Sequence, residues 1–290
     1  MENLLKRVIN AHSGDDLLSL PPDLYGGSLG IALFQAICYA DGFTDEPPQG
    51  AIRVFSDAIN YCRTMPDGLL HGSLGALWSL AFLWRNEVID VPCDIMRLAR
   101  ETVGSNSRYF YDSPFRYRSS SPLYPFGVAM MPLWSDEDTV SRYDWEEQII
   151  LRLCDCEKIL CQNLPGIHDC RSLSASMLHS IAAFCQMASR RRIFPFKADE
   201  LLMHICGRHC AAAGSDALVL SLMTGRKSLP GLAPGESPVS FLDYAGLLSV
   251  IYEQPELFEA AMRLFPIDDM AYDNNLPVGI GLGILNCMKK

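Results

Sequence analysis

A glycine-rich apolar segment that recurs along the chain is the sequence feature that most constrains its fold. GGSLGIALF (Gly26–Phe34) and HGSLGALWS (His71–Ser79) align without gaps, with Gly30 and Gly75 45 positions apart. A recurrence at such a period indicates stacked copies of one supersecondary unit. Four weaker copies follow, YPFGVAMMPLW (Tyr124–Trp134), SMLHSIAAF (Ser176–Phe184), SDALVLSLM (Ser215–Met223) and DYAGLLSVIY (Asp243–Tyr252), and a clear seventh copy is VGIGLGILN (Val278–Asn286).

The segments between these copies show the spacing of amphipathic helices. After Pro48, one face is marked by Ile52, Phe55, Ile59 and Cys62, and the helix PELFEAAMRLF is bounded by prolines at its two ends. An outer helix needs only one apolar stripe, whereas an inner helix surrounded by protein is apolar on all sides. The alternation therefore predicts an all-α fold, an α/α toroid (barrel) of about seven helical hairpins with inner and outer rings. We expect one domain over residues 1–290.

Charge and hydropathy bear on the partners. The chain has 24 basic and 34 acidic residues, a formal charge of −10, which repels nucleic acid and anionic membranes. Two uncharged runs, Leu24–Ala40 and Gly68–Trp84, approach the length of a membrane span. Each opens with glycine or a polar residue beside an amphipathic helix, so we expect buried helices and no membrane span.

The cysteines and the N-terminal segment bear on the compartment. Eleven cysteines, an odd number, are scattered through apolar segments instead of forming a compact disulfide framework. The segment MENLLKRVINAHSGDD has no apolar stretch typical of a secretory signal. We therefore expect free thiols and a cytoplasmic location.

Two longer segments interrupt the alternation of helices. Gly104–Phe126 carries seven aromatic residues and three arginines, and Gly225–Ser240 is rich in Pro, Gly and Ser. Long loops are commonly functional or disordered. The first segment is either a lid or peptide-binding edge, or an ordinary surface connection anchored by its aromatic side chains.

LYGGSLGIALF, GLLHGSLGALWSL and the ending LPVGIGLGILN resemble the inner-helix motifs of the lanthionine synthetase C-like family. The resemblance covers almost the whole chain. It implies the family's toroid of seven hairpins and a zinc-dependent cyclase, in which zinc activates a peptide thiolate for addition to a dehydrated serine or threonine. The family holds zinc with a Cys before the fifth inner helix and a Cys-His pair before the glycine of the sixth. A His in the fourth unit transfers a proton.

This sequence departs from the family's pattern at every one of these positions. Tyr244 and Ala245 stand where the Cys-His pair is expected, and the fifth turn has Gly214, Ser215 and Asp216 instead of a cysteine. In the fourth unit, Ser176 occupies the place of the proton-transfer His. The resemblance therefore implies the fold without the cyclase site.

The turns that lead into the inner helices carry polar residues, which a toroid would bring to one end around a central pocket. A competing interpretation is that each Asp or Asn simply caps a helix. IHDCR (Ile167–Arg171) is the densest group, and His179, inside an apolar run, is expected to be a core histidine. The candidate catalytic residues are His71, Asp67, His168 and Asp169; the candidate ligand contacts are Tyr25, Tyr124, Arg171, Asp216, Asp243, Tyr244 and Asn275.

A metal site receives weaker support. Cys206 and Cys210 share a helix face at i, i+4, and Cys170 and His209 are further weak candidates for zinc. Cysteine is also a common small core residue, so no cofactor is predicted.

Three functions are compatible with these observations. The first is a lanthionine synthetase C-like protein without the zinc cyclase site, which binds a peptide or small molecule in its central pocket and acts in peptide modification as a binding or scaffold partner. The second is a carbohydrate-active hydrolase or lyase with pocket carboxylates, for instance Asp67 and Asp169, as acid and base. The third is a divergent zinc enzyme that uses His168, Cys170, Cys206 or Cys210.

Overall fold

The computed structural model describes residues 1–14, 16–65, 68–90, 94–95, 97–99, 101, 129, 132, 175–190, 213–267 and 276–289. Within these ranges the chain is helical and contains no strand, which confirms the all-α class for the described part. Its helices are α1 (Glu2–His12), the short 3₁₀ helix η1 (Leu17–Ser19), α2 (Ser28–Ala40), α3 (Gln49–Thr64), α4 (Ser73–Arg85), α9 (Ala175–Arg190), α11 (Ser215–Met223), α12 (Pro238–Ile251), α13 (Pro255–Leu264) and α14 (Val278–Met288).

The two glycine-opened apolar runs form α2 and α4, and both helices are enclosed by protein on almost every side. In α2, every residue from Ser28 to Cys38 except Gln35 is buried, and in α4 every residue from Ser73 to Leu83 except Phe82 is buried. This confirms the prediction of helices that are apolar all round. Among the described residues, no helix combines the length and the hydropathy that crossing a bilayer requires.

Helices α1, α3 and α13 each bury one face. In α3 the buried residues are Ala51, Val54, Phe55, Ala58 and Cys62, spaced by three or four positions as one helical stripe requires. The predicted stripe was wrong at Ile52, which is 40% exposed, because Ala51 is the residue that lies on the buried face.

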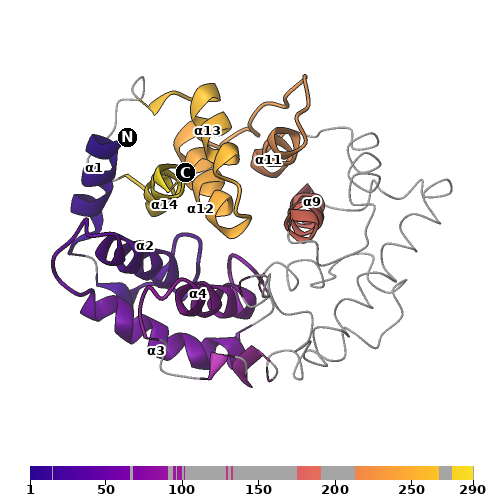
Figure 1. Ribbon diagram of the computed structural model, residues 1–290. Coiled ribbons are helices and arrows are strands. Elements are labelled where there is room, and N and C mark those ends of the chain that lie inside the picture. The colour runs from indigo at the N-terminus through magenta and orange to yellow at the C-terminus, as the bar shows by residue number, and fades with distance from the viewer. Residues whose placement is uncertain are drawn as a thin grey trace.

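The first and last units of the chain lie against each other. Figure 1 shows α2 and α4 with α3 outside them, and α14 between α12 and the N-terminal helices. Helix α14 contacts α1, α2, α12 and α13, while α9 contacts α11, and α11 contacts α12 and α13. Helix α14 near the end of the chain therefore packs directly on α1 and α2 near its start.

The sequence repeat is also a repeat of geometry. The amide of Gly30 donates to the Asp23 carbonyl (3.4 Å), and the amide of Gly75 donates to the Gly68 carbonyl (3.1 Å), at the same offset of 45 residues. A Cβ added to Gly30 would overlap the Leu24 carbonyl oxygen, and one added to Gly75 would overlap the corresponding oxygen of Leu69. The small residues are thus needed because each turn folds back over the start of its helix.

A third close approach joins α12 to α14. A Cβ on Gly246 would overlap the Gly279 carbonyl oxygen, and a Cβ on Gly279 would overlap the Asp243 carbonyl oxygen. The side chain of Asp243 also accepts a hydrogen bond from the Gly279 amide (2.7 Å), so α12 caps the start of α14. This contact fixes where the carboxyl group of Asp243 lies.

The segment from Thr224 to Ser237 is a non-helical loop, as the sequence predicts for Gly225–Ser240, but it ends earlier than expected. Ser237 caps α12 by accepting from the Ser240 amide (3.0 Å), and Pro238 is the first helical residue. The loop returns to the start of α11, where the Gly214 amide donates to the Gly231 carbonyl (2.9 Å).

Glu236 caps α11 from this loop, and its removal is expected to destabilise the fold. Its carboxylate accepts from the Ser215 amide (3.0 Å) and from the Ala233 amide (2.9 Å). Glu236→Ala should lower the free energy of unfolding by about 1 kcal/mol, because it leaves an amide of the first turn without its cap and removes an anion from the helix N-terminus. Glu236→Gln keeps an acceptor oxygen and should lose less in chemical denaturation; equal losses in the two variants would contradict the capping role.

Candidate functional site

Five of the predicted site residues lie in the described part of the chain, and the structure brings them to one region. Tyr25 and His71 lie in the turns before α2 and α4, Asp216 is the second residue of α11, and Asp243 and Tyr244 lie in α12. The other candidates lie outside the described residues: Asp67, Tyr124, His168, Asp169, Cys170, Arg171, Cys206, His209, Cys210 and Asn275.

The location expected for Asp243 and Tyr244 is corrected by the structure. Both were expected in a turn that leads into the sixth inner helix, but α12 begins at Pro238 and includes them. The cause is the Ser-Pro start, because a Ser cap and a proline at the first position begin a helix five residues before Asp243.

A line of aromatic rings runs through the site. The ring of Tyr25 lies edge-on to His71 (centroids 5.9 Å apart) and to Tyr244 (5.6 Å). His179 from α9 lies 6.2 Å from Tyr244 and 5.8 Å from Tyr252. We call His71, Tyr25, Tyr244, His179 and Tyr252 the aromatic line; such edge contacts are favourable between rings.

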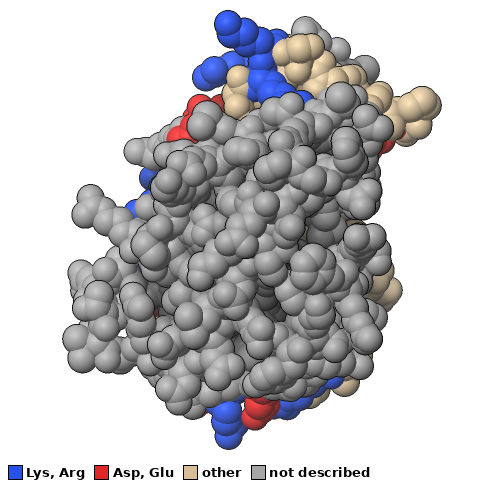
Figure 2. Space-filling view, turned by 90° about the vertical axis from the view of Figure 1, so that its right-hand side faces the viewer, with Lys and Arg blue, Asp and Glu red and all other residues tan. Residues whose placement is uncertain are grey.

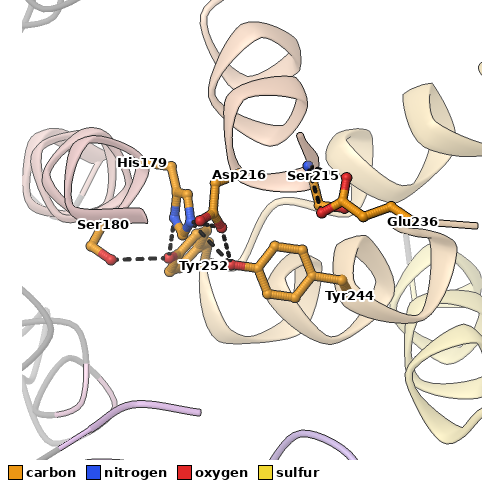
Figure 3. A network of polar contacts seen from close by, with 7 residues as sticks. All are labelled: His179, Ser180, Ser215, Asp216, Glu236, Tyr244 and Tyr252. Carbon is orange, nitrogen blue, oxygen red and sulfur yellow. Dashed lines mark hydrogen bonds and ion pairs between the residues drawn. The ribbon is translucent and has the colours of Figure 1, made fainter. Parts of the chain in front are cut away.

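His179 is the centre of a buried polar network (Figure 3). Its Nδ1 lies 2.8 Å from the Tyr252 hydroxyl, and its Nε2 lies 3.2 Å from Asp216 Oδ1 and 3.2 Å from the Tyr244 hydroxyl. Tyr244 donates to Asp216 Oδ1 (2.6 Å), and the Tyr252 hydroxyl lies 3.3 Å from Ser180 Oγ. The network joins α9, α11 and α12.

Burial sets the protonation of the two phenols in this network. Tyr252 is completely buried, and burial raises its pKa far above the ordinary value. Burial and the adjacent Asp216 charge likewise raise the pKa of Tyr244. Both hydroxyls therefore keep their protons and act as hydrogen-bond donors at neutral pH.

Asp216 is the partly exposed end of the network, with 40% of its side chain accessible. Burial raises its pKa, but the hydrogen bonds from His179 and Tyr244 lower it, and the net result is a pKa below the ordinary value. Among the described residues, only Oδ1 is hydrogen-bonded. Asp216 is thus an ionised carboxylate whose Oδ2 has no hydrogen bond to the described part of the chain.

Asp243 has the opposite electrostatic character. Its burial raises the pKa of its carboxyl group to about 6, although the Gly279 amide, His12 and the Tyr25 hydroxyl partly oppose this. Burial, together with Asp243, raises the pKa of Tyr25 to about 12. Two carboxyl groups near Tyr25 and Tyr244 therefore have pKa values that are displaced in opposite directions.

His71 and Asp23 form a pair at the outer end of the aromatic line. Nδ1 of His71 lies 3.2 Å from Oδ2 of Asp23, and the His71 side chain is 59% exposed. The carboxylate orients the imidazole by this contact, as it does in proteins where a histidine transfers protons. His71 remains a candidate for proton transfer on this geometry.

The sequence pattern gave no reason to select Tyr252 as a site residue, and it predicted that His179 is a core histidine. His179 is indeed 2% exposed, but its ring nitrogens bond three other polar side chains. The sequence did contain one indication of this network, a histidine within an otherwise apolar helix, because a buried polar side chain requires hydrogen-bond partners. The sequence alone could not show which helices supply those partners.

Metal-binding geometry and surface charge add little to this description. The described residues contain no group of three or more His, Cys, Asp or Glu side chains placed to hold a metal ion. Figure 2 views the molecule from the right-hand side of Figure 1, and the described residues that show at its upper and lower rims include both acidic and basic side chains. The candidate site is therefore described by the ring contacts of the aromatic line and the hydrogen bonds of the His179 network.

The chain was compared with models of protein families, with curated proteins and with solved structures, and none of the three comparisons finds a match.

Proposed function

We propose that the protein is a lanthionine synthetase C-like α/α toroid without the family's zinc cyclase site, and that it binds a peptide as a binding or scaffold partner in peptide modification. The packing of α14 on α1 and α2 supports a closed ring, because the last unit meets the first. The seven recurrent segments in the sequence support the same number of hairpins.

The observation that carries the proposal is the hydrogen bonding of Asp216 and Tyr244. These residues stand at two positions where the family's ligand motifs are expected, and they hydrogen-bond each other and His179. The Tyr244 hydroxyl holds the Asp216 carboxylate beside aromatic rings, where the carboxylate can accept hydrogen bonds from a ligand.

The ligand chemistry follows from charge. Asp216 is ionised and partly exposed, Tyr244 contacts it and Tyr25 lies against Tyr244, and the whole chain has a formal charge of −10. A lysine or arginine side chain, or the N-terminal amine of a peptide, would pair with this carboxylate and stack beside the rings. We therefore propose a peptide with a basic group as the ligand.

Asp216→Asn tests this function directly. A fluorescein-labelled trilysine peptide should bind the wild-type protein more tightly than a triglutamate peptide and lose about tenfold in affinity with Asp216→Asn, since one charge-assisted contact disappears. Fluorescence anisotropy measures both. Asp57→Asn, on the outer helix α3, removes the same charge elsewhere and should leave binding unchanged. Equal losses in the two variants would show that only the overall negative charge matters.

A second function, the carbohydrate-active hydrolase or lyase, is favoured by the opposed pKa displacements of Asp216 and Asp243. Carboxyl groups with such a difference are suited to act as base and acid. Turnover of a polysaccharide with a bell-shaped pH profile, abolished by either Asp→Asn substitution, would establish it; intact substrates across a panel of neutral and acidic polysaccharides would reject it.

A further inference from the structure

We propose that His179 is a positioning residue: Tyr252 and Ser180 hold it as the Nε2–H tautomer, and it fixes Asp216 Oδ1 so that Oδ2 faces a ligand. The part that concerns the ligand rests on the function proposed above. The part that concerns the tautomer and the carboxylate depends only on the geometry of the network.

The first step is the direction of the hydrogen bonds at Asp216. An ionised carboxylate only accepts, so both groups that contact Oδ1 must donate to it. The Tyr244 hydroxyl does so at 2.6 Å, and His179 Nε2 lies 3.2 Å from the same oxygen. Nε2 therefore carries a proton.

The second step is the state of the other ring nitrogen. Nδ1 lies 2.8 Å from the hydroxyl of Tyr252, closer than that hydroxyl is to Ser180 Oγ at 3.3 Å. Tyr252 keeps its proton and is completely buried, so its hydroxyl can donate to Nδ1 while it accepts from Ser180 Oγ, and the shorter Nδ1 contact favours this direction. With its proton on Nε2, the imidazole donates to Asp216 and accepts from Tyr252.

The third step concerns how Asp216 is held. Asp216 lies in the first turn of α11, and its partly exposed carboxylate would be free to turn toward solvent without its two donors. Among the described residues, the titratable groups that face it are His179 from α9, Tyr244 from α12 and Tyr252 directly after α12, while Glu236 binds the adjacent Ser215 amide. No lysine or arginine of the described residues pairs with it.

Two substitutions of His179 test whether it positions Asp216. His179→Leu removes both nitrogens, whereas His179→Gln retains an N–H donor that can reach the carboxylate. The proton affinity of Asp216, followed by the ¹³Cγ shift as pH is varied, should rise roughly tenfold or more in His179→Leu, because its burial is then opposed only by Tyr244. His179→Gln should restore part of that change. Ser221→Ala, a buried hydroxyl on α11 that bonds Ala217, serves as the control and should leave Asp216 unchanged.

The imidazole itself provides a second measurement that needs no disruptive variant. The ¹⁵N spectrum of His179 in the wild-type protein should show a protonated Nε2 and an unprotonated Nδ1. Tyr252→Phe removes the donor to Nδ1 and should introduce the Nδ1–H tautomer. A wild-type spectrum with the proton on Nδ1, or equal Asp216 titrations in His179→Leu and His179→Gln, would overturn the proposal. If His179→Leu does not fold, the ¹⁵N spectra of the wild type and Tyr252→Phe decide it.

Trilysine binding separates this inference from the proposed function. If Asp216 titrates as expected in the His179 variants but the wild-type protein does not bind trilysine, the positioning role stands and the proposed ligand is wrong. If Asp216→Asn weakens trilysine binding while neither His179 variant alters the titration of Asp216, the function stands and the positioning role is wrong.

Discussion

Gly279→Ala is expected to lower the free energy of unfolding by about 3 kcal/mol or more, or to prevent folding. An added Cβ would overlap the Asp243 carbonyl oxygen and lie 2.6 Å from Asp243 Oδ1. Both atoms are held by α12, and Gly246 of that helix in turn lies against the Gly279 carbonyl. Because the Asp243 carbonyl oxygen belongs to the backbone, a change of side-chain rotamer cannot relieve the overlap with it, and α12 and α14 would have to move apart.

Gly231→Ala is the matched control for this prediction. No atom lies within 4 Å of a Cβ built on Gly231, and its backbone is outside the left-handed region. Its effect on the free energy of unfolding should stay within about 0.5 kcal/mol. Urea denaturation followed by circular dichroism measures both variants; a Gly279→Ala protein as stable as Gly231→Ala would contradict the close packing of α12 on α14.

The requirement for glycine could be predicted from the sequence, because Gly30 and Gly75 occupy the same position in two aligned repeats. The structure shows the same amide contact and the same carbonyl neighbour for both. The apolar character of α2 and α4 also follows from their composition, because helices without a polar face must be enclosed. These features depend on residues that are close together along the chain.

The network around His179 could not be derived in the same way. Its members come from three helices, and Tyr252 is 73 residues from the imidazole that it contacts. Helical periodicity assigns each side chain to a face of its own helix, but it does not give the rotation of one helix against the next. The start of α12 was predicted too late because the repeat places the helix around Gly246. The residues that set the helix boundary are the Ser237 cap and Pro238.

Asp243→Asn is expected to stabilise the protein at neutral pH, by about 2–3 kcal/mol at pH 7. In the folded protein burial raises the pKa of Asp243 to about 6, above the ordinary value of 3.8 that applies to the unfolded chain. Between these values the folded state binds more protons than the unfolded state. The stability contributed by the protonated carboxyl group is therefore fully present below pH 3.8 and is lost as pH rises through 6.

Asparagine removes the cost of ionisation and keeps an oxygen that can accept from the Gly279 amide, so the cap on α14 survives. The difference in unfolding free energy between Asp243→Asn and the wild type should be small near pH 4 and should grow in favour of the variant up to pH 7. Asp216→Asn should show the opposite sign, because the pKa of Asp216 is lowered and its ionised form stabilises the fold at neutral pH. Urea denaturation at several pH values measures both; a difference for Asp243→Asn that does not change between pH 4 and pH 7 would show that the carboxyl group ionises without a cost from burial.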